Sequence, residues 1–222
     1  MAIDEMLLGS QAALDTAPTL RFYTWSVPAY SVGYFQDVDE IFKRFQSAKT
    51  SAPVVRRVTG GGLVFHGQDV TFSVTAKEND PFFSGEVKDS YLKVNEALRV
   101  GLKAVFQGID FADCKTIPSG RGKGNRICFE APSCYDLLLY GKKIVGASQR
   151  RKNNTVLYQS SVFLDGSEKI ICAHIIRGFK KKWHIDFLEK PLSSEELLSA
   201  QKIEGERYVS SDWVRLERSF CS

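Results

Sequence analysis

The chain has 222 residues, of which 43% are hydrophobic and 25% charged, and its net charge is +4. These values are ordinary for a globular protein, and the length suffices for one domain with a sizeable core. The longest basic run is residues 180–182, three lysines, whereas nucleic-acid binding calls for a denser basic stripe. No apolar run reaches the length of a membrane span. We therefore expect no nucleic acid and no membrane among the partners, while the mild positive charge suits an acidic protein partner.

The cysteines are five in number, an odd count, and their spacing is irregular: Cys114, Cys128, Cys134, Cys172 and Cys221. Because no CxxC pair occurs, the sequence signals neither a zinc site nor a redox dithiol. The pattern favours free thiols in a reducing compartment, one of which could be reactive. No signal peptide precedes the first predicted helix. The sequence thus predicts a cytoplasmic protein without a bound metal.

The first third of the chain predicts one helix followed by short strands. Apolar residues recur at helical spacing over residues 2–14. Residues 20–35 are rich in aromatic and β-branched types, and Pro28 divides them into two strands. Further strands are predicted at residues 54–57, 63–65 and 70–75, the first two of them flanking a glycine-rich turn.

The rest of the chain predicts a helix and then a strand meander. Apolar residues at three- and four-residue steps indicate an amphipathic helix over residues 88–107. Residues 115–126 are basic and glycine-rich, which is typical of a mobile surface loop. Strands are expected at 135–139, 143–145 and 155–164, with a tight turn at Gly141 and Lys142, and a capping box of Ser193 and Glu196 starts a last helix. We expect a single α+β domain over residues 1–222, a mostly antiparallel sheet with packed helices.

The first chemical signal is the segment RRVTGGGLVFH at residues 56–66. Three consecutive glycines expose backbone N–H groups and let the main chain approach a ligand closely. Arg56 and Arg57 beside them are suited to a phosphate or a carboxylate. The competing interpretation is a flexible hairpin turn with a solvated basic flank, which is the commoner case for three glycines alone. His66 by itself is more often a core histidine than a catalyst.

The second signal is CFEAPSCYD at residues 128–136. Cys128 follows Arg126 and a cationic stretch with Arg121 and Lys123. An electropositive setting favours the thiolate, which is the nucleophilic form. For any one cysteine, however, a small buried hydrophobe is the commoner role. Cys134 is the weaker candidate because it stands at the start of an apolar strand.

The third signal is GKKIVGASQ at residues 141–149. It places a lysine between glycine-bearing turns and next to an apolar run with small residues. Such an ammonium can hydrogen-bond an acyl carbonyl and stabilise the oxyanion formed when that carbonyl is attacked. An ordinary lysine at a hairpin tip is the alternative.

Together the three signals resemble the superfamily of lipoate and biotin protein ligases and octanoyltransferases. RRVTGGGLVFH followed by DVTFSV is similar to its acyl-pocket glycine loop, and GKKIVGASQ to its lysine motif. AIDEMLL and RFYTWSVPAYSVGYFQ resemble the opening helix and strands, although the strand that usually precedes that helix is not represented, as expected of a shortened or divergent member. The resemblance covers about residues 2–165 and implies a fold like the biotin/lipoate protein ligase catalytic domain.

Within the superfamily, CFEAPSCYDL is similar to the cysteine-dependent octanoyltransferases of the LipM type. Lipoate ligases typically read Arg-Asn-Asp-Leu in this segment. The resemblance implies that Cys128 is the nucleophile and that Lys143 binds the acyl carbonyl. It assigns the substrate pocket to Arg57, Thr59, Gly60, Gly61, Gly62, His66, Gly146 and Ala147, and position suggests that Trp25, Tyr34, Val64 and Phe72 wall the acyl tunnel.

The implied activity moves an octanoyl group from acyl carrier protein, through a cysteine thioester, to a lysine of a lipoyl domain or of glycine-cleavage H protein. No cofactor is needed. One alternative is an ATP-dependent lipoate–protein ligase, which would use ATP, Mg²⁺ and lipoate. Others are acyl transfer between carrier proteins and a non-catalytic module that binds lipoyl domains. Residues 158–161 read YQSS where the family usually has His-Gly, a departure that bears on substrate or acceptor preference.

Overall fold

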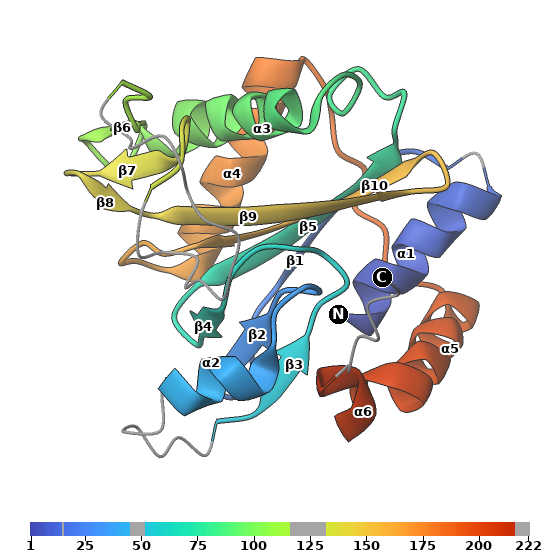
Figure 1. The fold of residues 1–222 in the computed structure, drawn as a ribbon. Coiled ribbons are helices and arrows are strands. Elements are labelled where there is room, and N and C mark those ends of the chain that lie inside the picture. Colours follow the sequence, from blue (N-terminus) through green and yellow to red (C-terminus); the bar gives the residue numbers. More distant parts are fainter. Residues whose placement is uncertain (15, 45–51, 116–131, 216–222) are drawn as a thin grey trace.

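The centre of the molecule is a four-stranded antiparallel sheet in the order β1-β5-β10-β9 (Figure 1). The computed structural model describes residues 1–14, 16–44, 52–115 and 132–215. The strands of this central sheet are β1 (Thr19–Tyr23), β5 (Val70–Lys77), β10 (Thr155–Val162) and β9 (Val145–Lys152). In register, Ser73 of β5 lies opposite Arg21 of β1 on one side and Gln159 of β10 on the other.

Two smaller sheets flank the central one. In the second sheet, β2 (Ala29–Val32) runs parallel to β3 (Val54–Arg56) and antiparallel to β4 (Val64–His66). The third sheet is an antiparallel meander of β6 (Ile109–Phe111), β7 (Leu137–Leu139) and β8 (Lys142–Lys143).

Helices cover both faces of the central sheet. Two long helices, α3 (Val87–Leu102) and α4 (Glu168–Trp183), lie side by side over one face, while α1 (Ala2–Ala13) and the second sheet lie on the other (Figure 1). The remaining elements are α2 (Val38–Arg44), α5 (Ser194–Ile203), the π-helical turn η1 (Glu204–Tyr208) and α6 (Ser211–Val214). Of these, α5 packs on α1 and α6 on β3.

Strand β5 shows why the two faces of the sheet differ. Its side chains alternate in direction, as in any strand. Phe72 and Val74 therefore enter the main core beneath α3 and α4, whereas Thr71 and Ser73 face the side of α1 and the second sheet, where both make hydrogen bonds. Nearly every residue of β5 is buried. A strand with one apolar and one polar buried face can thus support a core and a polar site at once.

The predicted α+β class and the mostly antiparallel sheet are confirmed. The predicted turn at Gly141 and Lys142 is shifted by one residue, because Tyr140 and Gly141 take the left-handed conformations (φ 48° and 82°) and Lys142 already belongs to β8. Helix α4 was not predicted from the sequence, although Ile171, Ile175 and Phe179 mark its buried face at four-residue steps. Most of the predicted 115–126 loop lies outside the described residues.

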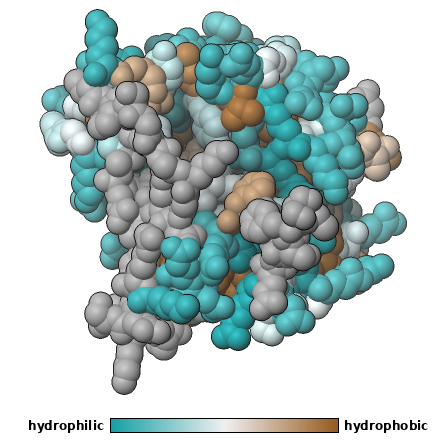
Figure 2. Space-filling model, in the orientation of Figure 1, coloured by the Kyte–Doolittle hydropathy of each residue, from teal (hydrophilic) through white to brown (hydrophobic). Residues whose placement is uncertain are grey.

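The surface is mainly hydrophilic on the face shown in Figure 2, with small hydrophobic patches between the polar residues. Among the described residues, no helix has both the length and the apolar character that crossing a membrane requires.

Candidate active site

A cavity lies between the central sheet and the second sheet. Five residues that the sequence assigned to the acyl site or its tunnel meet at the cavity wall, namely Arg57, Val64, His66, Gly146 and Ala147. They come from the end of β3, from β4 and from the start of β9. Segments far apart in the sequence are thus brought to one place by the fold.

The other three predicted tunnel residues lie elsewhere. The prediction for Phe72 is wrong, because strand alternation turns its ring into the core on the opposite face of the sheet. Trp25 stacks on the ring of His66, with the ring centroids 4.0 Å apart. Tyr34 packs against Phe35 and Trp213.

The glycine loop is held in place by the side chain of Arg57. The guanidinium group donates to the carbonyl oxygens of Gly60 (2.9 Å) and Gly62 (2.6 Å) and to the carbonyl of Ser31 (3.0 Å). The side chain of Arg57 is buried, so these charge-assisted bonds form away from bulk water, where they are strong. Arg57 therefore shapes the loop from within.

Arg56, on the other side of the strand, also donates hydrogen bonds to main-chain carbonyls. It is fully buried, and its guanidinium donates to main-chain carbonyls of Gly33, Tyr34, Gln36, Trp213 and Val214. We expected these two arginines to bind a phosphate or a carboxylate. In the structure both guanidinium groups are bound to carbonyl oxygens of the protein.

Thr59 connects the glycine loop to the central sheet. Its hydroxyl donates to Oε1 of Gln159 on β10 (2.7 Å) and accepts from Ser148 on β9 (2.9 Å). The amide of Gln159 in turn donates to Oδ2 of Asp4 in α1 (2.7 Å). The loop is therefore tied to β9, β10 and α1 through one chain of hydrogen bonds, and Gln159, noted in the sequence as a departure from the family, is its central member.

Asp4 anchors this chain from a fully buried position. Its carboxylate also accepts from Arg21 (2.7 Å), Ser73 (2.8 Å) and the hydroxyl of Tyr23 (3.1 Å). Burial, together with the charge of Asp4, raises the pKa of Tyr23 well above its ordinary value. Tyr23 is hence a permanent donor at the cavity wall. A buried carboxylate satisfied in this way is a rigid support.

Lys143 lies on β8 and forms an ion pair with Asp136, with Nζ and Oδ2 2.7 Å apart. Both side chains are largely buried, at 7% and 16% exposure. Three residues further on, Gly146 reaches the cavity wall. Lys143 thus keeps a paired ammonium group close in sequence to the cavity, on a short and well-anchored strand.

The predicted nucleophile Cys128 lies outside the described residues. The expectation of free thiols is wrong for Cys114 and Cys134, which form a disulfide. The fold brings the two together although 20 positions separate them, and sequence spacing could not reveal this. Cys134 was the weaker candidate and, as part of a disulfide, has no thiolate to offer. Burial raises the pKa of Cys172, which disfavours its thiolate as well.

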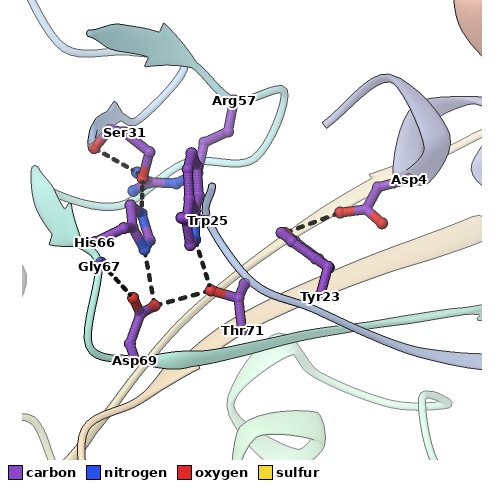
Figure 3. A network of polar contacts seen from close by, with 9 residues as sticks. All are labelled: Asp4, Tyr23, Trp25, Ser31, Arg57, His66, Gly67, Asp69 and Thr71. Atoms are coloured by element: carbon purple, nitrogen blue, oxygen red, sulfur yellow. Dashed lines mark hydrogen bonds and ion pairs between the residues drawn. The ribbon is translucent and has the colours of Figure 1, made fainter. Parts of the chain in front are cut away.

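Several polar residues of the site were not singled out in the sequence. Ser31, Asp69 and Thr71 surround His66 beside the cavity (Figure 3), and Asp4 supports Gln159 from α1. A signal existed for Asp4, which is a charged residue amid the apolar residues of a predicted helix. For Asp69 the signal was its place three residues after His66.

Comparison with known proteins identifies the family of the chain. Residues 1–191 match the family model of the lipoyl protein ligase A/B catalytic domain. The octanoyltransferase LipM of Moorella thermoacetica is 40% identical, over 97% of this chain and 92% of that protein. The octanoyltransferase LipM of Geobacillus kaustophilus is 32% identical, over 90% of this chain and 74% of that protein.

Solved structures show the same fold. A lipoate-protein ligase A bound with ATP superposes with a TM-score of 0.73 at 24% identity, over 96% of this chain and 92% of that one. The bipartite lipoate protein ligase of Thermoplasma acidophilum gives 0.71 at 23% identity, over 100% and 92%. The extent of the family match, over residues 1–191, shows that the chain belongs to the lipoyl protein ligase A/B catalytic domain family.

Proposed function

We propose that this protein is an octanoyltransferase of lipoate biosynthesis. The observation that carries the proposal is the 40% identity to an octanoyltransferase LipM over nearly the full length of both chains. The cavity beside β9 supports it, because residues of both predicted acyl-binding motifs line its wall. Burying each CH₂ of an acyl chain in the protein would contribute about 0.8 kcal/mol, enough to favour octanoyl over acetyl.

The proposed donor is octanoyl–acyl carrier protein, whose thioester carbonyl is attacked by the thiolate of Cys128. The new carbon–sulfur bond forms as the carrier's thiolate leaves and takes up a proton. Lys143 would hydrogen-bond the transient oxyanion, and one such donor is worth about 3–4 kcal/mol. The ion pair with Asp136 supports this role, since it fixes the ammonium group in position.

The second half-reaction passes the octanoyl group to a lysine amine of a lipoyl domain or of glycine-cleavage H protein. The neutral amine attacks the octanoyl-Cys128 thioester, the amide forms, the thiolate of Cys128 is regenerated, and the amine loses a proton. No ATP or metal is consumed, because one acyl-sulfur bond replaces another before the amide forms. The net charge of +4 suits an acidic carrier protein. A cytoplasmic location stays a prediction.

The test is intact mass spectrometry of the protein after incubation with octanoyl–acyl carrier protein and no ATP. We expect an octanoyl adduct that is absent in Cys128→Ser and retained in Cys172→Ser, the matched control. Transfer of the adduct to an added lipoyl domain completes the cycle. Turnover only with ATP and free lipoate would instead identify a ligase, and carrier binding without an adduct or turnover would identify a non-catalytic module.

A further inference from the structure

The ring of His66 is hydrogen-bonded on both sides beside the cavity (Figure 3). Its Nδ1 lies 2.8 Å from Oδ2 of Asp69, and its Nε2 lies 2.7 Å from Oγ of Ser31. The three side chains are at most 3% exposed. Trp25 stacks on the ring at 4.0 Å and donates to Thr71, which itself donates to Asp69. The position of the imidazole is thus fixed from every side.

The carboxylate of Asp69 sets the direction of these bonds. Burial raises the pKa of Asp69, but the hydrogen bond and charge of His66 and the hydroxyls of Thr71 and Ser161 outweigh burial and lower it below its ordinary value. Because an ionised carboxylate only accepts hydrogen bonds, Nδ1 of His66 carries the proton. When the ring is uncharged, Nε2 is the acceptor in the 2.7 Å contact with Ser31, and the hydroxyl of Ser31 donates to it.

Ser31 links His66 to Arg57 through a second hydrogen bond. With its hydrogen committed to His66, the oxygen of Ser31 accepts from Nη1 of Arg57 at 2.9 Å. The same guanidinium group holds the carbonyls of Gly60 and Gly62. A continuous hydrogen-bonded chain therefore runs from the start of β5 to the glycine loop, and three of its members, Ser31, Arg57 and His66, line the cavity.

We propose that Asp69, His66 and Ser31 form a positioning relay that fixes Arg57, and through it the glycine loop, in the shape that receives the acyl chain. The inference rests on the proposed octanoyl transfer for its substrate. It assigns His66 a role in setting KM for the acyl donor, and not in proton transfer.

The order Ser-His-Asp also occurs in serine hydrolases, where the serine attacks an acyl carbon. Two features separate the relay from such a triad. Ser31 Oγ already accepts a hydrogen bond from a cation, and its side chain is 1% exposed. A cation bonded to the oxygen lowers its nucleophilicity, and a nucleophile also needs access to its substrate.

The relay is tested first without substrate. The ¹⁵N signals of the imidazole report which nitrogen carries the proton, and His66→Gln assigns them among the three histidines. We expect Nδ1–H in the parent protein and loss of that state in Asp69→Asn. Amide hydrogen exchange of residues 57–62 should become at least tenfold faster in Asp69→Asn and Ser31→Ala.

The second arm measures octanoyl transfer. His66→Asn can keep the bond to Asp69 but not that to Ser31, and His66→Gln can reach Ser31 but not Asp69. We expect each variant, and Ser31→Ala, to raise KM for octanoyl–acyl carrier protein about tenfold with kcat changed less than threefold, because each loses a buried hydrogen bond of the relay. Ser31→Thr should restore most of the affinity. Thr75→Val is the control, because it removes a hydroxyl that is also buried on β5 and has no partner among the described residues.

The outcomes are distinguishable. Unchanged hydrogen exchange in the folded variants, or a fall in kcat at constant KM, would overturn the relay. So would an octanoyl adduct on Ser31 in the Cys128→Ser protein, which would identify a nucleophile. If the parent protein does not turn over octanoyl–acyl carrier protein at all, the proposed function fails, and the exchange and tautomer measurements still decide whether the relay orders the loop.

Discussion

The backbone at Gly33 lies directly against the backbone of Gly60 and Gly61 in the glycine loop. Gly33→Ala should therefore displace the loop. A Cβ at this position would lie 2.0 Å from the carbonyl oxygen of Gly61 and 2.9 Å from its carbonyl carbon. Both obstacles are backbone atoms, so no side-chain rotation can relieve the clash. The loop must move away by about 1 Å, and overpacking of this kind costs about 1–3 kcal/mol.

The loop cannot make this shift without losing contacts. It is fastened by the bond from the amide of Tyr34 to the carbonyl of Thr59 (2.8 Å) and by Arg57. We expect the free energy of unfolding to fall by about 2 kcal/mol. Octanoyl transfer should fall about 100-fold, since a misplacement of 1 Å can cost that much in rate.

Urea unfolding and the rate of octanoyl transfer to a lipoyl domain measure the two effects. Gly9→Ala is the matched control, because an added Cβ there meets nothing within 4 Å and the residue lies inside α1. It should leave activity unchanged and stabilise the protein by about 0.5–1 kcal/mol. Parental stability of Gly33→Ala, together with a transfer rate within about twofold of the parent, would contradict the backbone clash at this position.

Three further predictions concern other parts of the site. Lys143→Met should slow formation of the octanoyl adduct by about 100- to 1000-fold, as measured by quenched-flow mass spectrometry. The control is Lys142→Met, at the exposed neighbouring position, which should not slow it. Equal effects of the two substitutions would contradict the proposed oxyanion contact. Reductant should lower the free energy of unfolding of the parent protein by about 3 kcal/mol, because the disulfide closes a loop of 20 positions. It should have no such effect on the double variant Cys114→Ser, Cys134→Ser. The same effect on both proteins would exclude the disulfide as its source. The pKa of Asp69 is lowered in the folded protein, so its ionisation stabilises the fold at pH values above its ordinary pKa of 3.8, and this contribution disappears as the pH falls through the lower folded pKa. The difference in unfolding free energy between the parent and Asp69→Asn should therefore shrink below pH 3.8. A difference that does not change with pH would refute the assignment.

The buried ionic groups make the site rigid in two directions. Asp4 supports the glycine loop through Gln159 and Thr59, and Asp69 supports it through His66 and Ser31. The two chains start on different elements, α1 and β5, and end on the same loop. Because these polar groups are already oriented in the folded protein, the free-energy cost of orienting them falls on folding and not on substrate binding.

Local patterns in the sequence were sufficient for several of the elements and for the family. Amphipathic spacing located α1 and α3, the capping box of Ser193 and Glu196 located the start of α5, and the glycine and lysine motifs pointed to one acyl site. These features are local because they depend on residues a few positions apart, which interact whatever the rest of the chain does. Residues of both site motifs, Arg57, His66, Gly146 and Ala147, line one cavity, and their roles stay predictions.

Only the tertiary structure decided what these residues touch. The sequence suggested that Arg56 and Arg57 bind an anion, yet packing directs both at carbonyls of the protein. It suggested free thiols, yet the fold joins Cys114 to Cys134. It placed His66 in the substrate pocket but could not reveal its partner Ser31, which is 35 positions away on another strand. Partners at such separations are brought together by strand register and sheet packing, which no short stretch of sequence encodes.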